Sequence, residues 1–365
     1  MICPLVRTVD EVLQDPAAIE LIPPDTRAGV AALARRLPEA MHGFGFEIRT
    51  QPETSQVDFY TSVTARGGGR EAWAAFQPAL VDASPADAEA WQRVGAFARR
   101  WAAPTSPLYA RVDTVFLEFD APFTSGRPPS IFARLETDVG DGGQQWKQTI
   151  PAINEITAVL FGQPVGGATR TLLESAFRAL PAGGRIVDVA AMLPRGSLAV
   201  RLFIALPRAH LARYLGDLGW TDGQPTLARI DEALLGGCSH LSLQIDVGER
   251  LGSRVGIELS GAGAQDAAND WPAIGGRLQR LGFCSPRRAE ALARWPGIGA
   301  PSGALSAEGG RWPTQVVRVL SHVKLIVDPS HPPGHPPGHP PSRLPGHSVE
   351  AKVYLWATRR YVPLT

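Results

Sequence analysis

The chain has 365 residues, of which 44% are hydrophobic, and its formal net charge at pH 7 is +1. This length suffices for one large or two ordinary domains. The near-neutral charge gives no general attraction to nucleic acid or to a membrane surface. No apolar run approaches the ~20 residues of a transmembrane helix, and the N-terminus lacks the basic and apolar regions of a signal peptide. We therefore expect no nucleic-acid partner and no membrane partner.

Cysteine is rare in the chain, which contains only Cys3, Cys238 and Cys284. Three scattered cysteines cannot form the dense disulfide framework that is typical of small secreted domains. The sequence therefore predicts a protein of the reducing cytoplasm whose thiols are buried or incidental.

Two patterns alternate along the chain, namely apolar residues at helical spacing and apolar residues at every second position. In chain order, the sequence predicts helices at 8–20 and 26–42, strands at 44–50 and 57–64, helices at 71–82 and 86–102, strands at 111–120 and 130–138, helices at 150–162 and 167–180, strands at 185–193 and 197–206, helices at 207–219 and 225–236, two strands within 239–260, helices at 269–282 and 286–295, and strands at 316–328 and 348–358. The segment 296–313 is expected to be a loop. A helix–helix–strand–strand unit is thus repeated along the whole chain.

The hairpin within 239–260 shows the strand pattern most clearly. Leu241, Leu243 and Ile245 alternate with polar residues, and the second half of the segment alternates in the same way after a glycine-containing turn. A period of two gives each strand one apolar face and one polar face.

Five such hairpins, joined by helix pairs, supply enough antiparallel strands to close into a barrel with a wide lumen. Helices on the outside would cover the apolar strand faces, and the polar faces would point inward. We predict an α+β fold with a single domain over 1–365, formed by a closed ten-stranded antiparallel β-barrel ringed by helices. The alternative is a pair of smaller α+β domains divided near residue 182.

A His/Pro/Gly-rich segment at 329–347 interrupts the last hairpin and has the composition of a low-complexity loop insertion. It contains His331, His335 and His339 within HPPG repeats. Because polyproline II rises about 3.1 Å per residue, histidines four positions apart would be about 12 Å apart. This separation is too large for one metal ion, and we predict no metal site.

The pattern resembles the αββα barrel (ABBA or PT barrel) of soluble aromatic prenyltransferases. The first hairpin carries Asp58 in VDFYTSV, which is similar to a family strand with an inward Asp. The segment around Arg254 resembles a strand whose Arg binds diphosphate, and the segment around Lys352 resembles a strand whose Lys does so. In the second hairpin, Glu118 followed by Arg134 is similar to a pattern of catalytic Glu and diphosphate-binding Arg.

The polar phase of the strands gives an independent set of lumen residues. The candidate catalytic groups in this set are Glu118, Asp58 and His322. The candidate substrate- and diphosphate-binding residues are Arg134, Arg201, Arg254, Lys324, Lys352, Tyr354, Tyr60, Phe203 and Trp356. The basic members could neutralise a diphosphate, the aromatic members could shield an allylic cation, and an inward carboxylate could deprotonate a nucleophile.

The resemblance implies a transferase of natural-product biosynthesis that moves an isoprenoid from an allylic diphosphate to an aromatic small molecule or a peptide side chain. The partners would be the isoprenoid diphosphate and that acceptor, and the protein would be a monomer or homodimer. No cofactor is certain, and Mg²⁺ accompanying the diphosphate is the one candidate. Because the polar phase also carries many acidic residues, two alternatives stay open: a barrel that modifies ribosomal peptides by another reaction, such as thioether cyclisation, and a non-catalytic peptide-binding protein.

Overall fold

The computed structural model describes residues 5–51, 56–78, 83–124, 126–136, 142–235, 238–260, 271–301, 304–307, 310–329 and 348–362. Of the predicted insertion at 329–347, only residue 329 is among the described residues. Cys3 also lies outside them. Cys238 and Cys284 are buried, as the sequence predicts.

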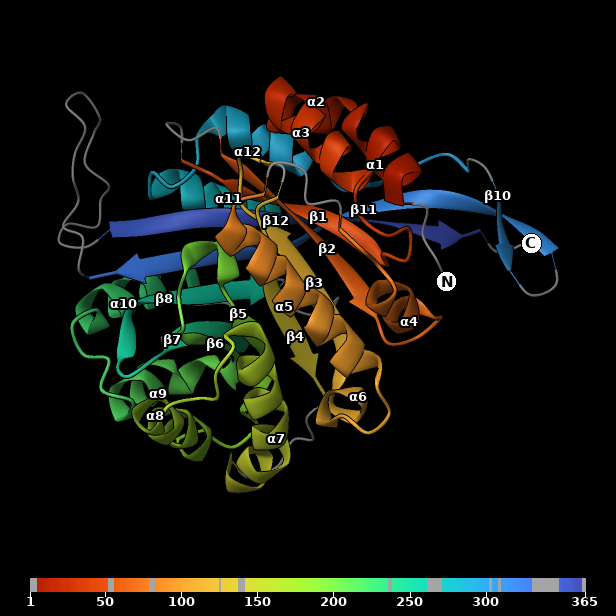
Figure 1. Ribbon diagram of the computed structural model, residues 1–365. Helices are drawn as coiled ribbons and strands as arrows, with labels where there is room; N and C mark the ends of the chain where they lie inside the picture. The colour runs from red at the N-terminus through yellow and green to blue at the C-terminus, as the bar shows by residue number, and fades with distance from the viewer. Residues whose placement is uncertain are drawn as a thin grey trace.

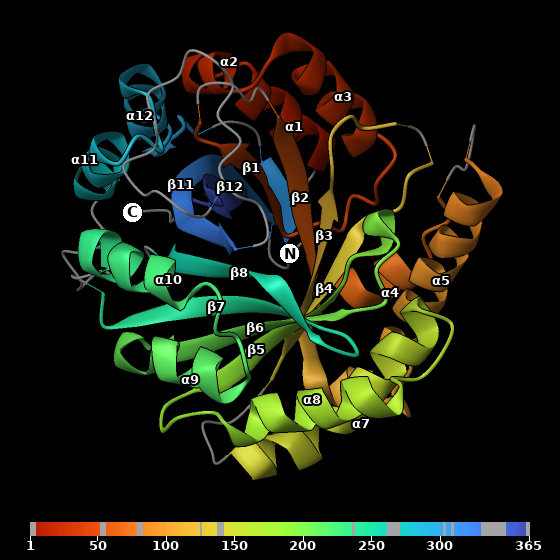
Figure 2. The same ribbon diagram turned by 90° about the vertical axis from the view of Figure 1, so that its left-hand side faces the viewer.

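The structure is built around one ring of antiparallel strands (Figures 1 and 2). The strands of this ring are β1 (Gly43–Arg49), β2 (Val57–Thr64), β3 (Val112–Phe119), β4 (Ser130–Leu135), β5 (Arg185–Ala191), β6 (Val200–Pro207), β7 (His240–Val247), β8 (Leu251–Ser260), β11 (Gly310–Asp328) and β12 (Ser348–Tyr361). Neighbours in sequence pair along the ring from β1 to β8 and from β11 to β12.

Two further pairings close the ring. Strand β8 pairs with β11, with Glu258 opposite Lys324, and β12 pairs with β1, with Tyr354 opposite Glu47. Because every strand of the ring has two neighbours, no long edge is left unpaired. The predicted closed ten-stranded antiparallel barrel is thereby confirmed.

Helices form a layer around the outside of the ring (Figure 2). They are α1 (Leu5–Leu13), α2 (Pro16–Leu21), α3 (Pro24–Ala34), α4 (Gly69–Ala74), α5 (Pro85–Ala102), α6 (Pro107–Arg111), α7 (Gly142–Leu160), α8 (Gly167–Arg178), α9 (Leu211–Asp217), α10 (Gln224–Ile230), α11 (Trp271–Arg280) and α12 (Pro286–Ala293). Short helical turns lie at η1 (Leu193–Arg195), η2 (Arg208–His210) and η3 (Asp231–Leu235).

Alternation along the strands places the core between the barrel and the helices. On β1, Phe44, Phe46 and Ile48 are fully buried and point outward into this layer. The ring of Phe46 meets the edge of Trp295, which follows α12, with the centroids 5.9 Å apart. The residues of β1 that alternate with Phe44, Phe46 and Ile48, including Glu47, therefore face the lumen, as the period of two requires.

The sequence prediction was wrong in several places outside the ring. The predicted helix 26–42 already ends at Ala34, and the short helix α6 was not predicted. The predicted helix 8–20 is two helices, because Asp15 accepts from the Ala17 N–H and caps a new helix that begins at Pro16. The predicted loop 296–313 contains β9 (Gly297–Ile298) and β10 (Ala304–Ala307), and β11 already begins at Gly310. Both short strands pair with the part of β11 that precedes its contact with β8.

Strands β11 and β12 are much longer than the other strands and continue beyond the ring as a ribbon that includes β10 (Figure 1). On its outward face the ribbon carries Arg359, which contacts Glu11 and Thr8 of α1. The N-terminal helices are thus attached to the last hairpin. In the described part of the chain, no helix has both the length and the apolarity that a membrane crossing needs.

Close packing on the lumen side of β1 yields a first prediction. A Cβ at Gly45 would lie 2.0 Å from the Leu355 carbonyl oxygen and 2.4 Å from the Tyr60 ring. We expect Gly45→Ala to lower the free energy of unfolding by about 1–3 kcal/mol, the range for overpacking, as measured by urea denaturation. The matched control is Gly167→Ala, where the added Cβ meets nothing within 4 Å. Equal stability of the two variants would contradict the described packing.

Candidate active site

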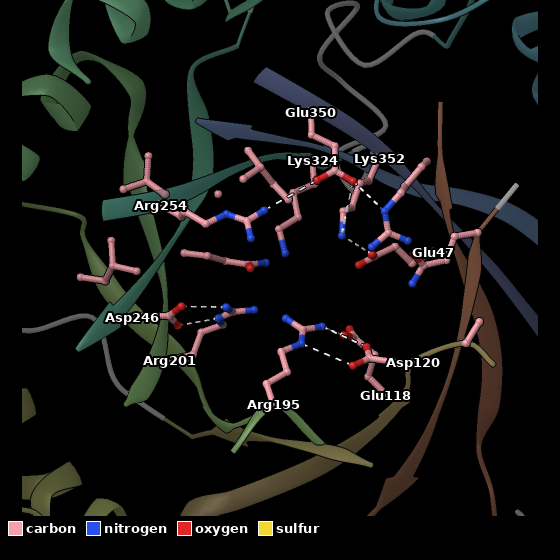
Figure 3. A pocket seen from close by; sticks show the side chains of 18 of the residues that line it. Glu47, Glu118, Asp120, Arg195, Arg201, Asp246, Arg254, Lys324, Glu350 and Lys352 are labelled. Atoms are coloured by element: carbon pink, nitrogen blue, oxygen red, sulfur yellow. Dashed lines mark hydrogen bonds and ion pairs between the residues drawn. The ribbon is translucent and has the colours of Figure 1, made fainter. Parts of the chain in front are cut away.

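A cavity of about 440 Å³ opens into the lumen at the end of the barrel that carries the hairpin turns. Its lining comes from residues beside these turns, such as Arg49 and Gln56 next to the β1–β2 turn and Asp246 and Arg254 next to the β7–β8 turn. Side chains from all sides of the barrel converge on this space (Figure 3).

Charged residues dominate the lining and carry both signs. The basic residues are Arg49, Arg127, Arg195, Arg201, Arg254, Lys324 and Lys352, and the acidic residues are Glu47, Glu118, Asp120, Asp246 and Glu350. The basic side chains of the lining outnumber the acidic ones by seven to five, but Arg49 and Arg254 also pair with Asp58 and Asp328, which lie outside the lining. The cavity therefore presents both signs of charge to a ligand.

Glu47 is the most deeply buried of these carboxylates, with 2% of its surface exposed. Its oxygens accept hydrogen bonds from the Lys352 ammonium and from the Tyr354 hydroxyl. Burial alone would raise the pKa of Glu47, but the charges of Lys352 and Lys324 and these two hydrogen bonds outweigh it and hold that pKa far below its usual range. Glu47 is therefore ionised at all physiological pH values.

Lys324 lies in the same cluster but has no carboxylate within ion-pair distance among the described residues. Its ammonium donates to the Tyr354 hydroxyl over 3.4 Å and lies 5.7 Å from the centre of that ring. Burial lowers the pKa of Lys324 to about 8, although the charges of Glu47 and Glu258 oppose the change. Gly256 leaves room for this lysine, because a Cβ there would lie 2.9 Å from the Lys324 Cε atom.

Most of the arginines of the cavity are paired. Arg201 forms a two-pronged contact with Asp246 at 2.7 and 2.8 Å. Arg254 lies 3.3 Å from Asp328 and 3.7 Å from Glu350. Such charge-assisted pairs hold the guanidinium groups in fixed orientations around the cavity.

Glu118 differs from the other carboxylates of the cavity. Burial and the nearby charge of Glu47 raise the pKa of Glu118 to about 7, while Arg195 and Lys324 act in the opposite direction. Arg195 lies 3.4 Å from Glu118 and 3.0 Å from Asp120. A carboxylate that titrates near neutral pH inside a cavity is suited to take up and release a proton.

Next to the charged lining, the lumen is walled by aromatic rings. Tyr60 stacks on Trp356 with centroids 5.6 Å apart and lies 5.8 Å from Tyr354. Phe116 meets the edge of Trp356 at 6.5 Å. The hydroxyl of Tyr60 donates to the Leu355 carbonyl over 2.8 Å, so the ring is fixed in place.

The structure divides the predicted site residues into two groups. Glu118, Arg201, Arg254, Lys324 and Lys352 line the cavity. Tyr354 contacts the lining residues Lys324 and Glu47, and Tyr60 and Trp356 form an aromatic cluster with it. Four others do not belong to the cavity lining: Asp58, Arg134, Phe203 and His322.

Each residue of the second group has its own partners. Arg134 pairs with Asp188 at 2.9 Å, and Phe203 packs edge-on against Phe132. Asp58 accepts from the Ala121 N–H over 2.8 Å, which ties it to the barrel wall.

His322 occupies a special place on β11. A register shift between Leu320 and His322 marks a β-bulge, which re-aims side chains locally. His322 stacks on Tyr354 with centroids 4.1 Å apart, and its ring nitrogens lie 3.0 Å from the Ser321 hydroxyl and 3.5 Å from Glu258. Its contacts with Tyr354 and Glu258 place His322 inside the lumen beside the aromatic rings, but it is not part of the cavity lining.

Several cavity residues were missed by the sequence reasoning. Glu47 and Arg49 stand on the polar phase of β1, and the same alternation that identified Asp58 could have found them. Asp120 ends the predicted strand 111–120 in the same phase as Glu118 and could have been found in the same way, whereas Arg195 lies in a turn where no periodicity indicates direction. Only the folded structure brings them together.

The donor set does not fit a resident Mg²⁺. Among the described residues, no three His, Cys, Asp or Glu side chains are grouped to hold a metal ion. The carboxylates of the cavity already face Arg or Lys, as Glu47 faces Lys352 and Asp246 faces Arg201. A hard cation would have to displace these partners.

Comparison of the sequence with protein-family models and with curated proteins finds no match. Among solved structures, the chain is similar to 6-dimethylallyltryptophan synthase from Micromonospora olivasterospora in complex with DMASPP and Trp, with a TM-score of 0.49, 15% identity and coverage of 96% of this chain and 95% of that chain. A second structure, a 6-dimethylallyl tryptophan synthase, gives a TM-score of 0.48 and 15% identity over 96% of this chain and 94% of the other. This likeness concerns the fold alone.

The Glu47 cluster yields a second prediction. Glu47→Gln removes the carboxylate that hydrogen-bonds to buried Lys352 and leaves Lys352 with the more distant Glu350, 3.9 Å away. We therefore expect the free energy of unfolding at pH 7 to fall by about 3–5 kcal/mol, the range for breaking a buried ion pair. Chemical denaturation measures this loss. As a control, Glu290→Gln breaks an exposed pair with Arg294 and should change stability by less than about 1 kcal/mol. A small effect at both positions would mean that Glu47 is not the central counter-ion of the lumen.

Proposed function

We propose that this protein is a prenyltransferase-like enzyme that moves an isoprenoid from an allylic diphosphate to an aromatic small molecule or a peptide side chain. The observation that carries the proposal is the placement of Lys324. This buried ammonium has no carboxylate within ion-pair distance among the described residues, and it lies between the charged cavity and the ring of Tyr354. Such a site offers a charge for diphosphate and an aromatic surface for the attached hydrocarbon.

In the proposed reaction, Lys324 binds the diphosphate with help from Arg254 and Lys352, which line the same cavity. Neutralisation of the leaving group lets the allylic carbon–oxygen bond break, and the electron pair leaves with the diphosphate. Tyr60 and Tyr354 then face the allylic cation with their ring surfaces.

The acceptor completes the reaction. A ring carbon or another nucleophilic atom of the acceptor forms a bond to the allylic carbon, and the proton released from that atom passes to Glu118. The products are the prenylated acceptor and diphosphate. The raised pKa of Glu118, about 7, suits a base that must be ionised before the reaction and regenerated afterwards.

The ion pairs of the cavity favour a second candidate function. Because Arg201 and Arg254 already face carboxylates, the lining offers both charges to a ligand. A polar peptide could exchange with these pairs, as expected for a peptide-modifying enzyme such as a thioether cyclase or for a non-catalytic peptide-binding protein. Binding of an isoprenoid diphosphate separates prenyl transfer from these alternatives.

Lys324 supplies the third prediction. We expect dimethylallyl diphosphate to bind the wild-type protein, as measured by calorimetry. Lys324→Met should weaken this binding by about 10- to 100-fold, the equivalent of ~1.5–3 kcal/mol for a hydrogen bond to a charged group. The control is Lys147→Met, since Lys147 lies exposed on α7. Absence of binding to the wild type would favour the peptide alternatives.

The shifted pKa values of Glu118 and Lys324 give the fourth prediction. Glu118 must be ionised to accept a proton, so kcat/KM should fall as the pH drops through about 7. Lys324 must be protonated to hold diphosphate, so kcat/KM should also fall as the pH rises through about 8. Plotted against pH, kcat/KM should therefore form a narrow bell. Because Glu118 and Lys324 interact, the apparent pKa values of the two limbs describe both groups together.

Variants at Lys324 and Glu118 show which residue causes each limb of the pH profile. Lys324→Arg keeps its charge at high pH and should remove the alkaline limb, whereas Glu118→Gln should abolish most of the turnover. A profile that stays flat between pH 6 and 9 would show that neither group titrates in the rate-determining complex.

A further inference from the structure

Arg195 reaches the cavity from the turn between β5 and β6, and this turn is held in a defined shape. The Arg195 N–H donates to the Met192 carbonyl over 3.1 Å, and the turn ends at Gly196, whose φ of 61° is left-handed and suits glycine. From the β3–β4 connection, Arg127 donates to the Pro194 carbonyl over 3.3 Å. The backbone that carries the Arg195 side chain is therefore held by two hydrogen bonds, one within the turn and one from Arg127.

The guanidinium of Arg195 bridges two carboxylates of the β3 end. It contacts Asp120 twice, from Nη2 at 3.0 Å and from Nε at 3.4 Å, and the same Nη2 reaches Glu118 at 3.4 Å. Asp120 thus anchors the guanidinium, which also extends toward Glu118. Figure 3 shows this group on the side of the cavity opposite Glu350 and Lys352.

Several charged groups face Glu118 from the surrounding strands. Its own connection contributes Asp120, β1 contributes Glu47, β11 contributes Lys324 and the β5–β6 turn contributes Arg195. On β2, Tyr60 lies opposite Glu118 in the register, and its pKa is itself raised by burial, so it is neutral. Arg201 of β6 also acts on Glu118 through its charge. The carboxylate of Glu118 is therefore surrounded by two anions and three cations, of which Arg195 is the one in direct contact.

We infer that Arg195 is a positioning residue: anchored by Asp120, it keeps the Glu118 carboxylate charged and directed into the cavity, and it is not a diphosphate ligand. This inference rests on the proposed function, in which Glu118 accepts the proton of the acceptor. Without Arg195, burial and the charges of Glu47 and Asp120 would act on Glu118, opposed by Lys324 and Arg201, which form no ion pair with it among the described residues. The carboxyl would then be protonated at neutral pH and could accept no proton.

Arg201 provides a contrast within the same cavity. Both prongs of its guanidinium are used by Asp246. Among the described residues Arg201 acts on Glu118 only through its charge, with no hydrogen bond or ion pair between the two side chains. Removing Arg201 therefore takes the same charge from the cavity without touching the Glu118 carboxylate, which makes Arg201→Gln a matched control.

The direct test measures the ionisation of Glu118 without any substrate. Carbon-13 NMR of glutamate side-chain carboxyls follows the titration, and loss of one signal in Glu118→Gln identifies the residue. In Arg195→Gln we expect the Glu118 midpoint to rise by about 1 pH unit or more above its wild-type value, as expected for loss of a neighbouring opposite charge. Arg195→Lys should raise it less, and Arg201→Gln should leave it closer to the wild type. An unchanged midpoint in Arg195→Gln would overturn the inference.

A second measurement separates positioning from diphosphate binding. Calorimetry with inorganic diphosphate should give Arg195→Gln a dissociation constant within about twofold of the wild type, while the acid limb of kcat/KM moves to higher pH. A tenfold weaker diphosphate affinity with an unchanged Glu118 midpoint would make Arg195 a ligand instead. Arg195→Lys, which retains the charge, guards against a folding defect, and thermal melting checks each variant. If no form of the protein makes a prenylated product, the proposed function fails, but the NMR titration still decides what Arg195 does to Glu118.

Discussion

The constraint on which the structure depends is the closure of an alternating sheet. Once β8 pairs with β11 and β12 pairs with β1, every polar strand face points into a common lumen. Charges that an open sheet would present to water are then buried, and burial of an unpaired charge is costly. Neighbouring charges of opposite sign offset this cost. The clearest case is Glu47, which accepts hydrogen bonds from both Lys352 and Tyr354.

The unequal pairing of these charges creates the chemistry of the cavity. Where the partners match, as in Arg201 and Asp246, the groups stay ionised and mainly shape the walls. Where they do not match, the ionisation shifts toward neutrality, as the pKa values of Glu118, about 7, and Lys324, about 8, indicate. Two groups that titrate near neutral pH beside an aromatic wall form an arrangement that suits binding of an anion and transfer of a proton.

The sequence predicted the strand ring and its inward faces because both follow from a local period of two that survives folding. It placed Glu118, Lys324 and Lys352 in the lumen for the same reason. It did not reveal which predicted residues share one cavity, since Arg134 and His322 have the same phase but lie at other heights of the barrel. Nor did it reveal Arg195, because a turn residue has no periodic neighbours and its direction is set by Gly196 and Arg127.

The proposed function depends on binding of the diphosphate of an allylic donor at Lys324. A crystal structure of the protein with inorganic diphosphate tests it most directly. We expect the anion within hydrogen-bond distance of the Lys324 ammonium, with Arg195 still between Asp120 and Glu118. Diphosphate bound outside the lumen, or a cavity that stays closed by its own ion pairs at saturating diphosphate, would contradict it.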